Sequence, residues 1–157
     1  DLFDRDFNMR VEEMDASASV VVVFGGTNHF GLGDAPIGKF TDNTVYTFYG
    51  ALHVLYRQLL ERFPEKDIIV LTPLHRLSEN VTINERGIPC EPLKKYVEAI
   101  REVAEYYSLP VLDLWKMSGM QPSVDVIREK YMPDGLHPSD LGAAKIADKL
   151  RDFLISL

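Results

Sequence analysis

The sequence has one cysteine, little positive charge and no long apolar run, and each of these shortages excludes or disfavours a class of protein. Cys90 is the only cysteine among 157 residues, which excludes an intramolecular disulfide and a zinc site with two thiolate ligands. A net charge of −7 argues against nucleic acid and anionic membrane surfaces as main partners. No apolar run is long enough to span a bilayer. The composition is otherwise ordinary for a soluble globular domain, with 46% apolar and 26% charged residues.

The sequence opens with Asp-Leu-Phe-Asp-Arg-Asp, which is acidic and amphipathic and does not have the pattern of a signal peptide. This stretch also lacks an initiator methionine. A single thiol fits a reducing compartment, and without a signal peptide we expect a cytoplasmic protein. The length favours one domain over residues 1–157, and we expect that this domain is incomplete at its amino end. No clear interface stripe is present, so the sequence leaves the oligomeric state open.

Helical and strand patterns alternate along the chain, which is typical of an α/β fold with a parallel sheet. Three short apolar runs predict strands buried on both faces, over residues 19–24, 67–71 and 110–114. Amphipathic periodicity predicts helices over residues 3–14, 44–63, 93–107, 123–130 and 140–154. The segments 31–43 and 72–92 are predicted to be loops, and the second is long enough to be functional.

Two of these helices begin beside residues that can cap them. Asn43 or Thr44 would cap the second helix, and Ser139 or Asp140 would cap the last one. The last helix is predicted to face the core with four residues, Leu141, Ala144, Ala147 and Leu150. Three strands are few for a sheet that helices cover on both faces, so we expect a strand–helix unit to be missing from the start.

A polar cluster follows the first predicted strand. Gly25 and Gly26 let the chain turn sharply as it leaves the sheet. Thr27, Asn28 and His29 then lie at the carboxyl end of the strand, where open α/β sheets place their ligands. A side-chain amide such as that of Asn28 can donate a hydrogen bond to a developing oxyanion. The alternative is that Asn28 closes the turn through its own backbone.

A second polar cluster, Asp134-Gly-Leu-His137-Pro, lies far downstream. A spacing of three residues lets one tight turn present both side chains on the same side. A carboxylate beside an imidazole fixes its tautomer and stabilises the imidazolium that forms during proton transfer. His137 can then act as the general base for a serine hydroxyl. The alternative is an aspartate that caps a turn beside an exposed histidine.

Together the two clusters resemble the SGNH (GDSL) hydrolases, a family of serine esterases and acylhydrolases. Gly25-Gly26-Thr27-Asn28 is similar to the Gly-x-Asn block of the family, and Asp134-Gly135-Leu136-His137-Pro138 is similar to its carboxy-terminal Asp-x-x-His block. The resemblance implies a flavodoxin-like, three-layer α/β/α sandwich with a parallel sheet, and neither a metal nor an organic cofactor. It also implies that Asn28 is an oxyanion donor, that His137 is the general base and that Asp134 orients it.

The sequence departs from the family pattern in three places. The family nucleophile is a serine in a Gly-Asp-Ser block after the first strand, and this chain has no such block. The second oxyanion glycine of the family precedes the Gly-x-Asn strand, whereas residues 1–24 contain no glycine. His29 stands where family members often have an aspartate. A chain that starts after the first strand explains the first two departures, so we expect the nucleophile outside residues 1–157 and no activity from these residues alone.

Other residues are candidates for parts of the site. Gly26, His29, His75 and Arg76 lie at the predicted carboxyl edge and are candidate substrate-binding residues, although Arg76 could equally pair with a surface carboxylate. Two serines, Ser78 and Ser118, lie on the side of the sheet where a nucleophile would have to be.

The sequence therefore predicts a serine esterase or acylhydrolase that cleaves a small ester or an acylated carbohydrate through an acyl-enzyme. One alternative is a non-catalytic binding module, either a degenerate hydrolase or one piece of a complemented assembly. Another is metal-dependent hydrolysis by His29, His75, Asp134 and His137, although no His-Glu-x-x-His helix or comparable ligand pair supports it.

Overall fold

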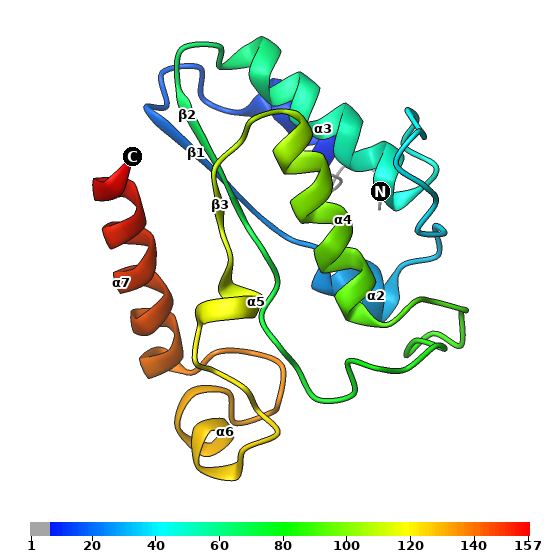
Figure 1. Ribbon diagram of the computed structural model, residues 1–157, viewed down its shortest axis with the longest axis vertical. Helices are drawn as coiled ribbons and strands as arrows, with labels where there is room; N and C mark the ends of the chain where they lie inside the picture. The colour runs from blue at the N-terminus through cyan, green and yellow to red at the C-terminus, as the bar shows by residue number, and fades with distance from the viewer. Residues whose placement is uncertain (1–6) are drawn as a thin grey trace.

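The computed structural model describes residues 7–157, which fold around a parallel sheet of three strands (Figure 1). The strands are β1 (Val20–Phe24), β2 (Asp67–Leu71) and β3 (Val111–Leu112), and they pair in the order β1-β2-β3. Phe24 lies beside Leu71, and Leu71 lies beside Leu112. The carboxyl ends of the strands therefore meet at one edge, and the predicted α/β class with a parallel sheet is confirmed.

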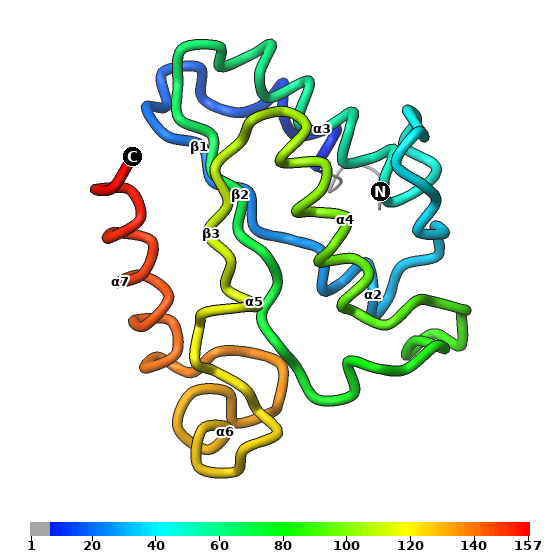
Figure 2. The backbone as a smooth tube through the Cα atoms, in the orientation of Figure 1, coloured from blue at the N-terminus to red at the C-terminus, as the bar shows by residue number. Residues whose placement is uncertain are grey.

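Helices lie on both faces of this sheet. α3 (Phe48–Arg62) and α4 (Leu93–Tyr106) pack on one face, and α7 (Asp140–Ser156) packs on the other (Figure 1). The shorter elements are α1 (Phe7–Arg10), the 3₁₀ turn η2 (Val11–Glu13), α2 (Thr27–Leu32), α5 (Leu114–Met117) and α6 (Asp125–Tyr131). Figure 2 traces the long connection from β2 to α4. This connection contains an isolated antiparallel β-bridge between Ile83 and Pro89.

The two faces of the sheet form separate cores, because successive strand residues point to opposite sides. Val21, Ile68 and Val70 are buried against α3 and α4. On the other face, Ile69 and Leu71 pack with Leu112. The α7 residues that cover this second core are Ile146, Leu150, Phe153 and Leu154. The structure is therefore a three-layer α/β/α sandwich, as expected.

Strand β1 is buried on one face only, and the prediction of a strand buried on both faces is wrong. Val21 is 2% exposed, whereas Val20, Val22 and Phe24 are 39%, 41% and 42% exposed. Val22 lies beside Ile69 in the sheet, so the exposed side chains share the face that α7 covers. The core on that face contains residues of β2 and β3 and none of β1 among the described residues.

Several predicted boundaries also differ from the structure. Helix α3, predicted over residues 44–63, is capped by Thr47 and not by Asn43 or Thr44. The Oγ1 atom of Thr47 accepts a hydrogen bond from the Gly50 amide at 3.1 Å. The loop predicted from residue 31 starts later, because α2 continues to Leu32. The third strand is shorter than predicted, because the Asp113 side chain caps α5.

The last helix is capped by Ser139, one of the two predicted caps, through a hydrogen bond of 3.2 Å from the Gly142 amide to Oγ. Its buried stripe differs from the prediction. Leu141, Ala144 and Ala147 are exposed, because the packed side is the one that presents the larger Ile146 and Phe153 to the sheet. Only Leu150 belongs to both stripes.

At the amino end, residues 7–13 form α1 and η2, within the helix predicted over residues 3–14, and the rest of that prediction before Phe7 lies outside the described residues. None of the helices in residues 7–157 combines the length and the apolar character that a membrane crossing requires.

The one-sided burial of β1 predicts different costs for two matched substitutions. Val21→Ala should lower the free energy of unfolding by about 2 kcal/mol, because it removes two buried methyl groups and leaves a cavity. Val22→Ala removes the same volume from the same strand and should cost less than about 1 kcal/mol, because its side chain is already partly in water. Urea unfolding of the protein made of residues 1–157, followed by circular dichroism, measures both values. Equal losses would contradict the one-sided burial.

Candidate active site

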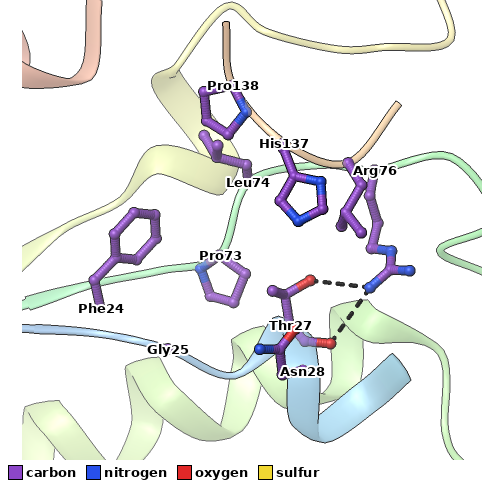
Figure 3. A pocket seen from close by; sticks show the side chains of 10 residues that line it. Phe24, Gly25, Thr27, Asn28, Pro73, Leu74, Arg76, His137 and Pro138 are labelled. Carbon is purple, nitrogen blue, oxygen red and sulfur yellow. Dashed lines mark hydrogen bonds between the residues drawn. The ribbon is translucent and has the colours of Figure 1, made fainter. Parts of the chain in front are cut away.

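A cavity of about 240 Å³ lies at the carboxyl edge of the sheet, where open α/β folds place their ligands (Figure 3). Three stretches of chain line it: the end of β1 with the start of α2, the segment after β2 and the loop before α7. The lining residues are Phe24, Gly25, Thr27, Asn28, Pro73, Leu74, Arg76, Leu136, His137 and Pro138. The cavity therefore brings the two polar clusters of the sequence together.

The turn from β1 into α2 depends on Gly26. Its φ of +117° lies in a region that side chains disfavour, and an added Cβ would meet Ile100 Cδ1 at 3.0 Å. Helix α2 follows directly, so Asn28 lies in its first turn and lines the cavity. Gly26 itself is not part of the lining; it shapes the turn.

The side-chain amide of Asn28 makes no hydrogen bond to any other part of residues 7–157, and α2 has no side-chain cap at its amino end. The alternative in which Asn28 closes its own turn is therefore not what the structure contains. Asn28 is exposed, and His137 points from the loop before α7 toward Thr27 and Asn28 (Figure 3). The amide is available to a group that enters the cavity.

Asp134 and His137 form the pair that their spacing predicts. Asp134 Oδ2 lies 2.6 Å from His137 Nδ1, and Oδ1 accepts hydrogen bonds from the amides of Leu136 at 2.8 Å and His137 at 2.7 Å. Gly135 between them has a φ of +77°, and a Cβ there would lie 2.5 Å from Leu77 Cδ1. The tight turn thus requires glycine and holds the carboxylate against the imidazole.

This arrangement sets the protonation of the pair. The hydrogen bond from the His137 side chain, followed by those from the two backbone amides, holds the pKa of Asp134 well below its usual range. An ionised carboxylate only accepts hydrogen bonds, so the Nδ1–H group of His137 donates a hydrogen bond to Asp134. Nε2 is then the nitrogen that can accept a proton from a group in the cavity.

Arg76 is the one cation that lines the cavity among the described residues. Its side chain is 8% exposed, and Nη2 lies 3.0 Å from Glu85 Oε1. Nη1 donates to the carbonyl of Thr27 at 3.4 Å and to its hydroxyl at 3.3 Å (Figure 3). The pairing with a carboxylate that the sequence left open is present, but the guanidinium is buried beside α2.

The structure does not bring His29 and His75 into the cavity. The His29 ring packs against Phe48, with ring centroids 4.9 Å apart. His75 stacks on Trp115 at 3.6 Å and lies 3.0 Å from Glu79 through Nδ1. In the part of the chain that the structure describes, no group of three or more His, Cys, Asp or Glu residues is placed to hold a metal ion.

Neither candidate serine lines the cavity. Ser118 is 2% exposed, and its Oγ accepts a hydrogen bond from the Met120 amide. Ser78 lies in the loop between β2 and α4 with a φ of +58°, and it borders a second, smaller cavity that Arg76 also lines. Of residues 7–157, no serine shares the cavity with His137.

Sequence reasoning missed the apolar wall of the cavity. Pro73 and Leu74 follow β2, and Pro138 follows His137. Their positions directly after a predicted strand and a predicted catalytic residue were the signal that could have identified them.

Comparison with known proteins places this cavity in a wider context. The GDSL-like lipase/acylhydrolase family model matches residues 2–145. One solved structure is 34% identical, matches 98% of this chain and 73% of its own, and has a TM-score of 0.84. A protein from Lactobacillus plantarum is 30% identical, matches 95% of this chain and 72% of its own, and has a TM-score of 0.83.

A more distant structure, of a peptidoglycan O-acetylesterase, is 18% identical and matches 96% of this chain and 40% of its own, with a TM-score of 0.64. At this identity the likeness concerns the fold alone. No curated protein matches the sequence significantly.

The hydrogen bonds around Asp134 predict its titration. Its carboxyl should titrate below the ordinary value of 3.8, so the stability that it contributes is present above pH 3.8 and is lost as the pH falls through the lower, folded value. His137→Ala should raise the pKa of Asp134 toward 3.8 without restoring it, because the two backbone amides remain. NMR titration of the Asp134 carboxyl carbon measures both, and an ordinary pKa in the unmodified protein would refute the pairing.

Proposed function

The chain belongs to the GDSL-like lipase/acylhydrolase family, and from this premise we propose that it is the larger part of a serine esterase that cleaves a small ester or an acylated carbohydrate. One observation carries the proposal. His137, held by Asp134, points into the same cavity as the amide of Asn28, which bonds to no other group within residues 7–157. A general base and an oxyanion donor on opposite sides of one cavity are the groups that acyl transfer to and from a serine requires.

The proposed reaction begins when a serine hydroxyl attacks the acyl carbon and Nε2 of His137 takes its proton. Asp134 keeps the imidazole oriented and stabilises its charged form. The amide of Asn28 donates a hydrogen bond to the oxyanion of the tetrahedral intermediate. His137 then gives the proton to the leaving alcohol, and in a second round it activates the water that releases the acid from the acyl-enzyme.

The nucleophilic serine comes, in this proposal, from a segment outside residues 1–157. Two observations support this source. The relatives at 34% and 30% identity extend beyond the matched part, which makes up 73% and 72% of their chains. In addition, one edge of β1 has no partner strand among the described residues, and the side chains on its open face are apolar.

The segment would add a strand to the free edge of β1, followed by a helix beside α7 that covers Val20, Val22 and Phe24. Pairing of the backbone and burial of these apolar side chains supply the driving force. Phe24 also lines the cavity, so the carboxyl end of an added parallel strand would lie next to it. A serine at that strand end would face His137.

The acyl group of the proposed ester would lie against the apolar wall that Pro73, Leu74 and Pro138 form beside Asn28 and His137. The second candidate function is a non-catalytic binding module, which the lack of a serine in the cavity lining of residues 7–157 favours.

Labelling with a fluorophosphonate distinguishes the two functions. We expect the full-length product of the reading frame that encodes this chain to react at one serine, located by peptide mass mapping outside residues 1–157. The reagent needs a serine activated by His137, so His137→Ala should abolish the label. Label on Ser78 or Ser118 would contradict the external source of the nucleophile. A folded, unlabelled full-length protein would support the binding module.

The same full-length protein should lose activity when His137 is removed. His137→Ala should lower kcat for p-nitrophenyl acetate by about 10⁴–10⁶, because the members of a catalytic triad act as a unit. The circular dichroism spectrum should not change, since the His137 side chain is 75% exposed and its side-chain partner within residues 7–157 is Asp134. Lys149→Ala, in helix α7, serves as the control and should retain full activity. Unchanged turnover in His137→Ala would overturn the mechanism.

A further inference from the structure

Helix α2 carries Asn28 but cannot hold its own position. It contains six residues, and isolated helices of that length are unstable in water because nucleation costs more than one or two hydrogen bonds return. The groups that surround α2 must therefore determine where the Asn28 amide lies. Phe30 packs α2 against Tyr96 of α4, and residues 76–86, in the loop between β2 and α4, supply the hydrogen bonds to its two ends.

The carboxyl end of α2 is held by three consecutive loop residues. The side chain of Asn84 donates a hydrogen bond to the carbonyl of Gly33 at 2.8 Å. The backbone amide of Glu85 donates one to the carbonyl of Gly31 at 3.2 Å. Nη1 of Arg86 donates to the carbonyl of Leu32 at 2.9 Å. These bonds satisfy carbonyls at a helix end that would otherwise face water.

The amino end of α2 is held by Arg76. Its guanidinium donates to both oxygens of Thr27, the residue before Asn28, and lies 5.3 Å from the ring centroid of Phe30. Gly31 gives it room, since a Cβ there would lie 3.0 Å from Nη1. Nη2 pairs with Glu85, so the loop that binds the carboxyl end of α2 also fixes the group that binds its amino end.

We propose that Arg76 is a positioning residue, which holds the first turn of α2 so that the Asn28 amide stays directed at the oxyanion. This inference rests on the proposed role of Asn28. The planar guanidinium binds Thr27 with one nitrogen and Glu85 with another, a geometry that a lysine ammonium does not reproduce. Small displacements of a catalytic group lower the rate by large factors. The contacts of Arg76 with Thr27 and Glu85 should therefore affect kcat through the position of Asn28.

A double-mutant cycle in the full-length protein tests this coupling. With p-nitrophenyl acetate, Arg76→Lys should lower kcat by about 10- to 100-fold and leave KM within about twofold, because an oxyanion donor contributes roughly 10²–10³ in rate. In the Asn28→Ala background, the same substitution should change kcat by less than about threefold. Gly31→Ala, which pushes on the retained Arg76, should reproduce the kcat loss, and Arg151→Lys should have no effect.

An equal kcat loss from Arg76→Lys in both backgrounds, or a loss confined to KM, would overturn the proposal. Hydrogen exchange gives a readout that does not depend on activity. Arg76→Lys should speed exchange of the Phe30 and Gly33 amides, which bond to the carbonyls of Gly26 and His29, by about tenfold and leave the amides of α4 unchanged. Unchanged exchange in α2, or equal acceleration in α4, would also overturn it.

The two proposals fail in different ways. If Asn28→Ala leaves kcat unchanged, the assigned role of Asn28 in catalysis is wrong. In that case the exchange of the α2 amides still decides whether Arg76 holds the helix.

Discussion

The parallel register of the three strands is the constraint on which the site depends. Phe24 lies beside Leu71, and Leu71 lies beside Leu112, so all three strands end at one edge. Adjacent strands are about 5 Å apart, and the segments that leave β1 and β2 therefore start as neighbours. This proximity places Asn28 and Arg76, which are 48 residues apart in the sequence, around one cavity. The turn at Gly26 then decides which way the first of these segments runs.

The two faces of the sheet are covered unequally. Against α3 and α4, strand β1 contributes Val21 to a core that also includes β2. On the opposite face α7 covers β2 and β3, and Val22 and Phe24 of β1 remain partly in water. Exposed apolar side chains on an edge strand favour association with a further strand or helix. The proposed location of the nucleophile follows from the fact that this open face borders the cavity through Phe24.

The two halves of the site are built in different ways. Asp134 and His137 are largely exposed, at 54% and 75%, and their geometry comes from hydrogen bonds and one glycine within a single turn. Asn28, in contrast, belongs to a six-residue helix whose position depends on a loop from the other side of β2. Proton transfer thus relies on local structure, whereas the oxyanion donor relies on packing. Changes in distant parts of the chain should therefore affect the second half more than the first.

The sequence by itself determined the parallel α/β class, the two polar clusters and the Asp134–His137 pair, because each rests on apolar runs or on contacts between residues a few positions apart. Only the tertiary structure decided that Arg76 lines the cavity while His29 and His75 pack elsewhere. It also decided the buried stripe of α7 and the one-sided burial of β1. These features depend on contacts between residues far apart in the sequence, such as Thr27 and Arg76 at a separation of 49 residues. A local sequence pattern does not determine which polar or apolar face of an element meets such a distant residue.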